Sequence, residues 1–326
     1  MKTNLKQIAG LALMTVFISC NSDDDNNGNN NPPQQTIAEI ASGTANLSML
    51  TDALERANLT ATLDGTTQLT VFAPTDAAFT SFLQANGFAN IDAVPVNVLK
   101  EVLLNHVVAG ESTATQLTTG YVKTMAKGGA SATNNLSMFV NTSGGVTLNG
   151  GTANSGAKVT TADVQASNGV VHIVDGVIAL PTVVNHAIAN PDFSVLVQAL
   201  TRDDQPDFAG ILSGTANSPF TVFAPNNAAF TSLLSELSLS GLADVPQATL
   251  EKTLKYHVVT GANVLASGLT EGMTVATFSG DSFTIGLTGG PKITDFNSRV
   301  SNIIATDVQA SNGMIHAIDK VLLPDL

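Results

Sequence analysis

The heptapeptide DVQASNG occurs twice in this chain of 326 residues, at 163–169 and again at 307–313. Each copy continues through two apolar residues to a histidine, His172 in the first and His316 in the second, 144 positions later. A repeat this close, at a spacing of ordinary domain length, indicates that the chain contains two copies of one domain.

A second pair of matching segments predicts a strand followed by a helix in each copy. LTVFAPTDAAF at 69–79 matches FTVFAPNNAAF at 220–230. The apolar run TVFA is typical of a buried strand, and the proline that follows ends it because proline has no N–H for a ladder. Thr75 and Asn226 then stand where a helix N-cap is expected.

A third match, VLLNHVVAG at 102–110 against TLKYHVVTG at 253–261, puts a histidine at helical spacing from apolar residues. It predicts that His106 and His257 lie on a buried helix face or just beyond the helix end. The following Gly-, Ser- and Thr-rich segments predict short antiparallel strands, with a hairpin turn at Asn149–Gly150. This part of the second copy is seven residues shorter than in the first.

The repeated heptapeptide itself predicts a tight Ser-Asn-Gly turn between two strands, with Gly169 and Gly313 free to adopt positive φ. Alternation in the returning strand places His172 on the apolar face. The copies join at Leu180–Pro181, so we expect domain 1 at 36–180 and domain 2 at 181–326.

The N-terminal segment resembles a bacterial lipoprotein signal. Lys2 and Lys6 precede an apolar run too short to span a bilayer, which ends in FISC at Cys20, the chain's one cysteine. The resemblance implies a signal peptide over 1–20 and lipidation of Cys20; an ordinary secretory signal is the alternative. A single cysteine also excludes an internal disulfide.

Residues 21–35, NSDDDNNGNNNPPQQ, predict a disordered tether because they contain no side chain able to enter a core. The acidic run 23–25 is either a solvated spacer or a surface-export signal like that of Bacteroidetes lipoproteins. We therefore expect a lipid-anchored outer-membrane protein, on the periplasmic face or, favoured, the cell-surface face.

The formal charge is −13, or about −15 without the N-terminal segment, and the basic residues form no patch. A nucleic-acid partner would need clustered Lys and Arg to neutralise phosphates, so the charge pattern excludes that class.

Together these blocks resemble the fasciclin-type domain, twice and in the family's order. The resemblance rests on TVFAPTDAAF and TVFAPNNAAF, on the pair Tyr256-His257, and on NGVVHIVDGVI and NGMIHAIDKVL. Asn105 departs from the family's tyrosine, and Asn227 stands opposite Asp76. The resemblance implies an α+β fold of two tandem domains, each a helical bundle packed on a β-wedge of short mixed strands.

No catalytic constellation emerges from the sequence. His106, His172, His257 and His316 lie on apolar faces and are interpreted as structural, hydrogen-bonded core histidines. His172 and Asp175 are three apart on a strand and point to opposite faces. Known hydrolase, phosphate-binding and metal-binding patterns do not occur, so neither a metal nor a cofactor is predicted. The acidic cluster Asp203, Asp204 and Asp207 is interpreted as a solvated loop.

For binding, the fasciclin resemblance offers an Asp-hydrophobic element just before the turn, implicated in integrin recognition in some animal members. The matching residues are Asp163-Val164 and Asp307-Val308, without the flanking Glu-Pro. The alternative is that these aspartates hydrogen-bond the adjacent turn.

The sequence therefore favours a non-enzymatic, surface-tethered adhesion or extracellular interaction module. Its expected partners are the membrane, through the lipid, and a cell-surface or matrix protein or glycan. The alternative is a glycan- or matrix-polymer-binding accessory protein of the outer membrane. A pocket gathering histidines or acids would instead favour a hydrolase or small-ligand carrier.

Overall fold

The computed structural model describes residues 34–326, and Gln35–Leu326 form one compact unit. The predicted signal peptide with Cys20, and most of the predicted tether, lie outside the described residues. Within the described range, the helices are all too short or too polar to cross a bilayer.

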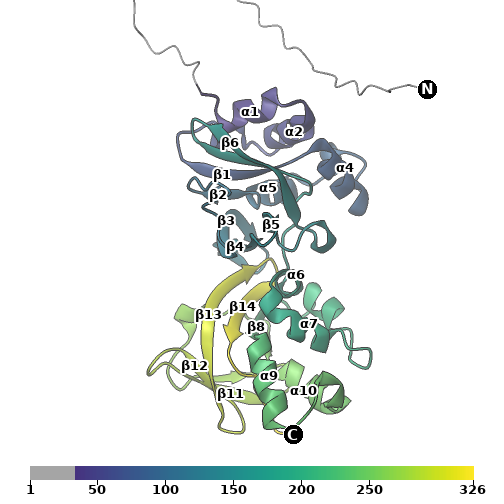
Figure 1. Ribbon diagram of the computed structural model, residues 1–326, viewed down its shortest axis with the longest axis vertical. Coiled ribbons are helices and arrows are strands. Elements are labelled where there is room, and N and C mark those ends of the chain that lie inside the picture. The colour runs from purple at the N-terminus through teal and green to yellow at the C-terminus, as the bar shows by residue number, and fades with distance from the viewer. Residues whose placement is uncertain (1–33) are drawn as a thin grey trace, which may run out of the picture. The chain divides into compact units, whose positions relative to one another are not determined.

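The strands of domain 1 form a closed barrel in which neighbours in sequence are neighbours in space (Figure 1). The parallel pairing of the first and last strands closes the ring, and all other pairs are antiparallel. These strands are β1 (Leu69–Pro74), β2 (Val107–Ala109), β3 (Gly120–Gly128), β4 (Ser131–Asn141), β5 (Thr147–Leu148), β6 (Ala157–Ala166) and β7 (Gly169–Val174).

The helices of domain 1 come before the barrel strands or between the first two of them, and they carry an apolar face toward the sheet. They are α1 (Ile37–Gly43), η1 (Ala45–Leu47), α2 (Ser48–Arg56), α3 (Thr60–Leu63), α4 (Asp76–Ala85), η2 (Ile91–Ala93) and α5 (Val96–Leu104); a short η3 (Thr152–Asn154) lies between β5 and β6.

Domain 2 repeats this order with shorter third and fourth strands and an open sheet, β10-β11-β12-β13-β14-β8-β9, again with one parallel pair, β8–β14. Its strands are β8 (Phe220–Pro225), β9 (Val258–Thr260), β10 (Thr274–Ala276), β11 (Ser282–Gly286), β12 (Lys292–Thr294), β13 (Val300–Ala310) and β14 (Gly313–Ile318). Its helices are α6 (Val183–Ala189), η4 (Pro191–Phe193), α7 (Ser194–Leu200), α8 (Phe208–Ser213), α9 (Asn227–Glu236), η5 (Leu242–Asp244), α10 (Gln247–Tyr256) and η6 (Ala266–Gly268).

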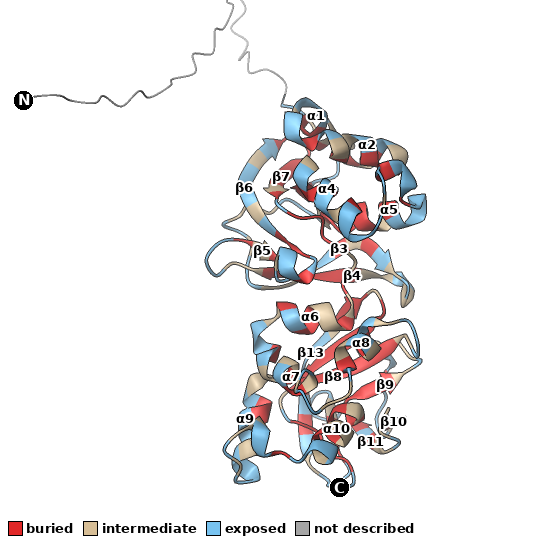
Figure 2. Cartoon of the chain, turned by 90° about the vertical axis from the view of Figure 1, so that its right-hand side faces the viewer, coloured by how far each residue is buried: buried red, intermediate tan, exposed pale blue. Residues whose placement is uncertain are grey.

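The predicted strand, proline stop and helix are confirmed in both domains. All residues of β1 and β8 are buried (Figure 2). The Thr75 hydroxyl accepts a hydrogen bond from the Ala78 N–H at 3.3 Å, and the Asn226 side chain accepts one from the Ala229 N–H at 2.9 Å. Each cap satisfies an N–H that the first helical turn leaves free.

The predicted Ser-Asn-Gly turn is present in both copies, but its residues do more than reverse the chain. The Asn168 side chain accepts from the Ile37 N–H at 2.9 Å and donates to the carbonyls of Leu63 and Gly65 at 2.8 and 2.6 Å. It therefore fastens α1 and the end of α3 to the turn. Asn312 makes the equivalent contacts in domain 2.

Of the two turn glycines, both expected to be free to adopt positive φ, Gly169 does so, at 139°, and Gly313 does not. Gly313 is needed for another reason: a Cβ there would lie 2.4 Å from the carbonyl oxygen of Phe220 on the neighbouring strand. Gly169 meets Leu69 in the same way at 1.9 Å. Close strand packing excludes a side chain at both positions.

The hairpin predicted at Asn149–Gly150 is also corrected. Both residues have positive φ, at 48° and 80°, as a tight turn requires. The chain then runs on through η3 and reaches β6 only at Ala157, so the connection is a longer loop and not a two-residue hairpin.

Candidate interaction surface

Asp163 and Asp307, the predicted binding aspartates, interrupt the strands on which they lie. Each has φ of 61°, and each coincides with a register shift in the β6–β7 or β13–β14 pairing. Aspartate tolerates this left-handed conformation better than most residues. The carboxylates accept from the Ala114 and Ala266 N–H groups at 2.7 and 2.8 Å. Their partner is thus a loop far upstream, not the adjacent turn that the alternative interpretation named.

His172 and His316 lie beneath these aspartates, fully buried. In each ring Nδ1 accepts from the main-chain N–H of the aspartate, at 3.2 Å for His172 and 3.4 Å for His316. Because an N–H can only donate, the proton is on Nε2, which donates to the carbonyl of Ser112 or Val264. Both imidazoles are neutral and have no free nitrogen.

His106 and His257 have the opposite tautomer with the same consequence. Nδ1 donates to the carbonyl four residues earlier at 2.7 Å in both, and Nε2 accepts from the Ile178 or Leu322 N–H at 2.8 or 2.9 Å. Burial lowers the pKa of each imidazole to about 4. His106 thus joins the end of α5 to the segment after β7, and His257 joins the end of α10 to the segment after β14. Both ring nitrogens are used in these contacts, so neither ring can exchange a proton with a substrate.

Three other acidic candidates, Asp175, Asp204 and Asp207, form hydrogen bonds or ion pairs within the fold. Asp175 accepts from the Lys158 N–H at 2.7 Å and does not contact His172. Asp204 pairs with Arg202, and Asp207 caps α8 through the Gly210 N–H at 2.8 Å. Among residues 34–326, no group of three or more His, Cys, Asp or Glu side chains is arranged to hold a metal ion.

The two Asp-Val elements differ sharply in their surroundings. In domain 1 the Asp163 side chain is 39% exposed, Val164 is half-buried and Gln165 is exposed. In domain 2, Val308 and Gln309 are 5% and 0% exposed. Val308, predicted as a binding residue beside Asp307, is therefore buried and not accessible to a partner.

Domain 1 covers the second element with its own long β3–β4 hairpin, which lies against β13 (Figure 1). Lys123 Nζ donates to the Asp307 carbonyl at 2.7 Å, and the Gln309 N–H donates to the Ser137 hydroxyl at 3.0 Å. At the hairpin tip the Ala130 N–H donates to the Ser311 carbonyl at 2.9 Å. The hairpin thus binds main-chain groups along the outer edge of β13.

Among residues 34–326, the matching edge of β6 in domain 1 has few partners. β5 pairs with β6 at Ala157 and Lys158, the Val159 N–H donates to the Val146 carbonyl at 2.9 Å, and the Ser167 N–H, just beyond the strand, donates to the Gln35 carbonyl at 2.8 Å. Gln165 pairs with β7 in the same register as Gln309 pairs with β14. Its N–H therefore points away from β7, and the Asp163 carbonyl lies beside it. Neither group has a hydrogen-bond partner among the residues that the structure describes, and such a donor and acceptor on a strand edge can pair with another chain.

One further histidine, His186 on α6, lies at the junction of the domains, fully buried against the Tyr121 ring at a centroid distance of 5.5 Å. Neither ring nitrogen has a hydrogen bond of normal geometry, although the Gln309 main chain lies close by. Burial lowers its pKa to about 4. This junction could not be predicted from the sequence, in which the seven extra residues of the first copy are the one feature that accompanies it.

Comparison with known proteins agrees with the repeat. The fasciclin domain model matches residues 45–181 and 191–324. The chain belongs to the fasciclin domain family. Both domains are α+β, as predicted, and the fasciclin resemblance is confirmed over nearly all of the described chain.

Among bacterial fasciclin relatives, uncharacterized protein sll1735 of Synechocystis is 35% identical over 144 residues, covering 44% of this chain and 98% of that protein. Porcine transforming growth factor-beta-induced protein ig-h3 is 28% identical over 89% of this chain but 39% of its own length. Human periostin is 31% identical over 59% of this chain and 21% of its own length. This chain thus spans less than half of those animal proteins.

A domain pair from the insect cell adhesion molecule fasciclin I matches with a TM-score of 0.48 and 21% identity, over 87% of this chain and 94% of that one.

Proposed function

We propose that this tandem fasciclin protein is a non-enzymatic adhesion module, tethered to the outer membrane by a lipid on Cys20 and facing the cell surface. The observation that carries the adhesive part is the open β6 edge of domain 1, with Asp163, Val164 and Gln165 accessible. The membership of the family, with an adhesion molecule among its structures, supports the same class.

The covered edge of domain 2 suggests how a partner binds. There a hairpin supplies a lysine to the Asp307 carbonyl and a hydroxyl to the Gln309 N–H. The matching residues of domain 1, Asp163 and Gln165, are exposed. The proposed partner is therefore a surface or matrix protein that adds an extended segment carrying a basic side chain. The chain's formal charge of −13 favours a basic partner in the same way.

Attachment of the immobilised full chain to intact bacterial cells and to an extracellular-matrix preparation tests this proposal. Gln165→Lys places a like charge where the partner's basic group binds and blunts the strand edge. Attachment to at least one target should fall about tenfold, an effect of 1.4 kcal/mol. Thr66→Lys, at an exposed turn, is the control with the same change of charge and should attach normally.

Equal attachment of the Gln165→Lys and Thr66→Lys variants would show that the β6 edge is not the adhesive surface. The lipid anchor is tested separately: Cys20→Ser should release the protein from the membrane fraction, and an unchanged membrane fraction would exclude lipidation. The glycan-binding alternative has a different structural basis, a cleft on the same domain.

A further inference from the structure

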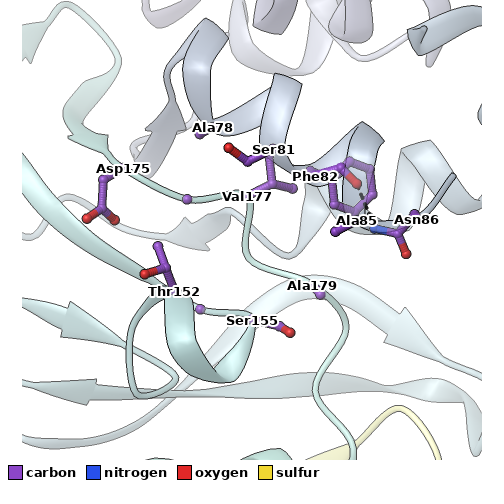
Figure 3. Close-up of a pocket in the computed structure, with 12 residues that line it drawn as sticks. Ala78, Ser81, Phe82, Ala85, Asn86, Thr152, Ser155, Asp175, Val177 and Ala179 are labelled. Carbon is purple, nitrogen blue, oxygen red and sulfur yellow. Dashed lines mark hydrogen bonds between the residues drawn. The ribbon is translucent and has the colours of Figure 1, made fainter. Parts of the chain in front are cut away.

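Domain 1 contains a cleft of about 630 Å³ between α4 and the segments that flank β6 and follow β7 (Figure 3). A volume of this size is typical of small-ligand sites. Its lining residues are Ala78, Ser81, Phe82, Ala85, Asn86, Thr152, Ser155, Gly156, Asp175, Gly176, Val177 and Ala179.

The lining combines five polar residues with small or apolar ones and contains no basic residue. Ser81, Thr152 and Ser155 contribute hydroxyls, Asn86 an amide, and Asp175 a carboxylate. In Figure 3, Asp175 and Thr152 lie at one end of the cleft, and the Phe82 ring and Asn86 lie at the other. Asp175 uses only Oδ1 within the domain, for the Lys158 N–H, and Asn86 uses only its Nδ2, for the Phe82 carbonyl. The remaining oxygens are available as acceptors.

In domain 2 the Arg299 side chain occupies the position that corresponds to the cleft of domain 1. Arg299 donates to the Val321 carbonyl at 2.9 Å and to the Glu236 carboxylate at 2.8 Å, and so joins the turn before β13 to α9. Asp295 holds the same guanidinium at 3.2 Å. The Arg299 side chain is 17% exposed.

The repeat register gives the counterparts of these residues in domain 1. Ser155 is the counterpart of Arg299, because each lies two residues before an equivalent strand residue, Ala157 or Ser301. Ala85 stands at the Glu236 position. Val177 stands at the Val321 position. All three line the cleft. Domain 1 therefore lacks the arginine that fills this position and also the glutamate that binds it.

These exchanges define the ligand chemistry. Domain 1 has no glutamate at the Glu236 position, so its cleft lacks the carboxylate that binds the guanidinium in domain 2. The cleft instead presents hydroxyls, an amide, one carboxylate and one aromatic face. Such a set forms multiple hydrogen bonds to neutral hydroxyl groups. Asp175, with no basic residue in the lining, disfavours an anionic ligand.

We propose that this cleft of domain 1 binds a neutral oligosaccharide. The site is separate from the β6 edge, and its ligand is a carbohydrate, not an extended protein segment. Adhesion through β6 and sugar binding in the cleft can thus succeed or fail independently.

The test is binding of cello-, xylo-, manno- and chitotetraose to the full chain by saturation-transfer NMR and calorimetry, with a heparin tetrasaccharide and free arginine as charged probes. At least one neutral tetraose should bind, and heparin tetrasaccharide should not. The variant Ala85→Glu with Ser155→Arg introduces the ion bridge of domain 2 and should weaken binding at least tenfold. Ser42→Arg with Ala61→Glu, at exposed positions outside the cleft, is the charge-matched control and should bind normally.

Unfolding temperatures of both double variants must match the parent; if the cleft variant does not fold, Asn86→Ala replaces it and should also weaken binding. Binding of no neutral tetraose, binding of arginine alone, or equal binding by the cleft and control variants would each overturn the proposal. Loss of sugar binding with attachment intact would support the cleft while leaving the β6 proposal standing on its own test.

Discussion

Lys123 of domain 1 lies 2.7 Å from the Asp307 main-chain oxygen of domain 2, and its ammonium also donates to Ser137 at 2.9 Å. This contact gives the two identical heptapeptides different surroundings. The first copy remains accessible at a strand edge, and the second becomes part of the junction between the domains.

Replacement of Lys123 by methionine should loosen this junction. Methionine keeps the apolar stem but leaves the Asp307 carbonyl without its charged donor, which is expected to cost about 1–2 kcal/mol. Urea unfolding measures the loss. Lys158→Met, at an exposed position of domain 1, serves as the control and should be close to neutral. Equal stability of the two variants would contradict a stabilising role for Lys123.

Stability should fall on acidification below pH 6.5. All five histidines are buried, and burial lowers the pKa of His106, His186 and His257 to about 4. Between pH 6.5 and 4 the unfolded chain binds protons that the folded one does not, so stability is full above 6.5 and is lost toward 4. Each of these histidines should contribute about 2 kcal/mol to the loss between pH 7 and pH 5.

Urea unfolding at both pH values checks this, with His257→Gln as the variant. It should be less stable than the parent at pH 7, and its loss on going to pH 5 should be smaller by about 2 kcal/mol. A pH dependence unaltered by the substitution would show that His257 does not titrate with folding.

Asn168→Ala should destabilise domain 1 by about 3 kcal/mol, because it leaves the Ile37 N–H and the Leu63 and Gly65 carbonyls without their partner. Thermal unfolding is the measurement. Asn46→Ala, at an exposed position, should change the unfolding temperature little. A similarly small effect at Asn168 would mean that water replaces its contacts.

Gly169→Ala should prevent normal folding or cost more than about 3 kcal/mol, because the new Cβ would lie 1.9 Å from the Leu69 carbonyl oxygen. Comparison with Gly87→Ala distinguishes the effect of this clash from that of backbone strain. Gly87 also has positive φ, 71°, but nothing lies within 4 Å of its added Cβ, so only about 1 kcal/mol is expected. Circular dichroism melts of both variants distinguish the two causes, and equal losses would reject the clash.

The local elements could be predicted from the sequence because near neighbours determine them. The proline after TVFA, the caps Thr75 and Asn226, and the alternation around His172 each act over a few residues. The fasciclin signature then supplied the arrangement of helices on strands that these patterns alone do not determine.

The surface could not be predicted in the same way, because identical residues in the two copies meet different neighbours. Asp163 and Asp307 have the same φ and the same kind of loop contact, and only the longer β3–β4 hairpin covers one of them. The cleft likewise depends on what is missing from domain 1, the counterpart of Arg299, which no motif in the first copy indicates.

Amide hydrogen exchange across 159–167 and 303–311 most directly tests the central claim, that the β6 edge of domain 1 is the adhesive surface and its counterpart in domain 2 is covered. In the free chain the Gln309 amide should exchange slowly and the Gln165 amide rapidly. When the attachment target is bound, new protection should appear at 159–167. Equal exchange of the two amides in the free chain, or protection by the target only outside 159–167, would contradict the account.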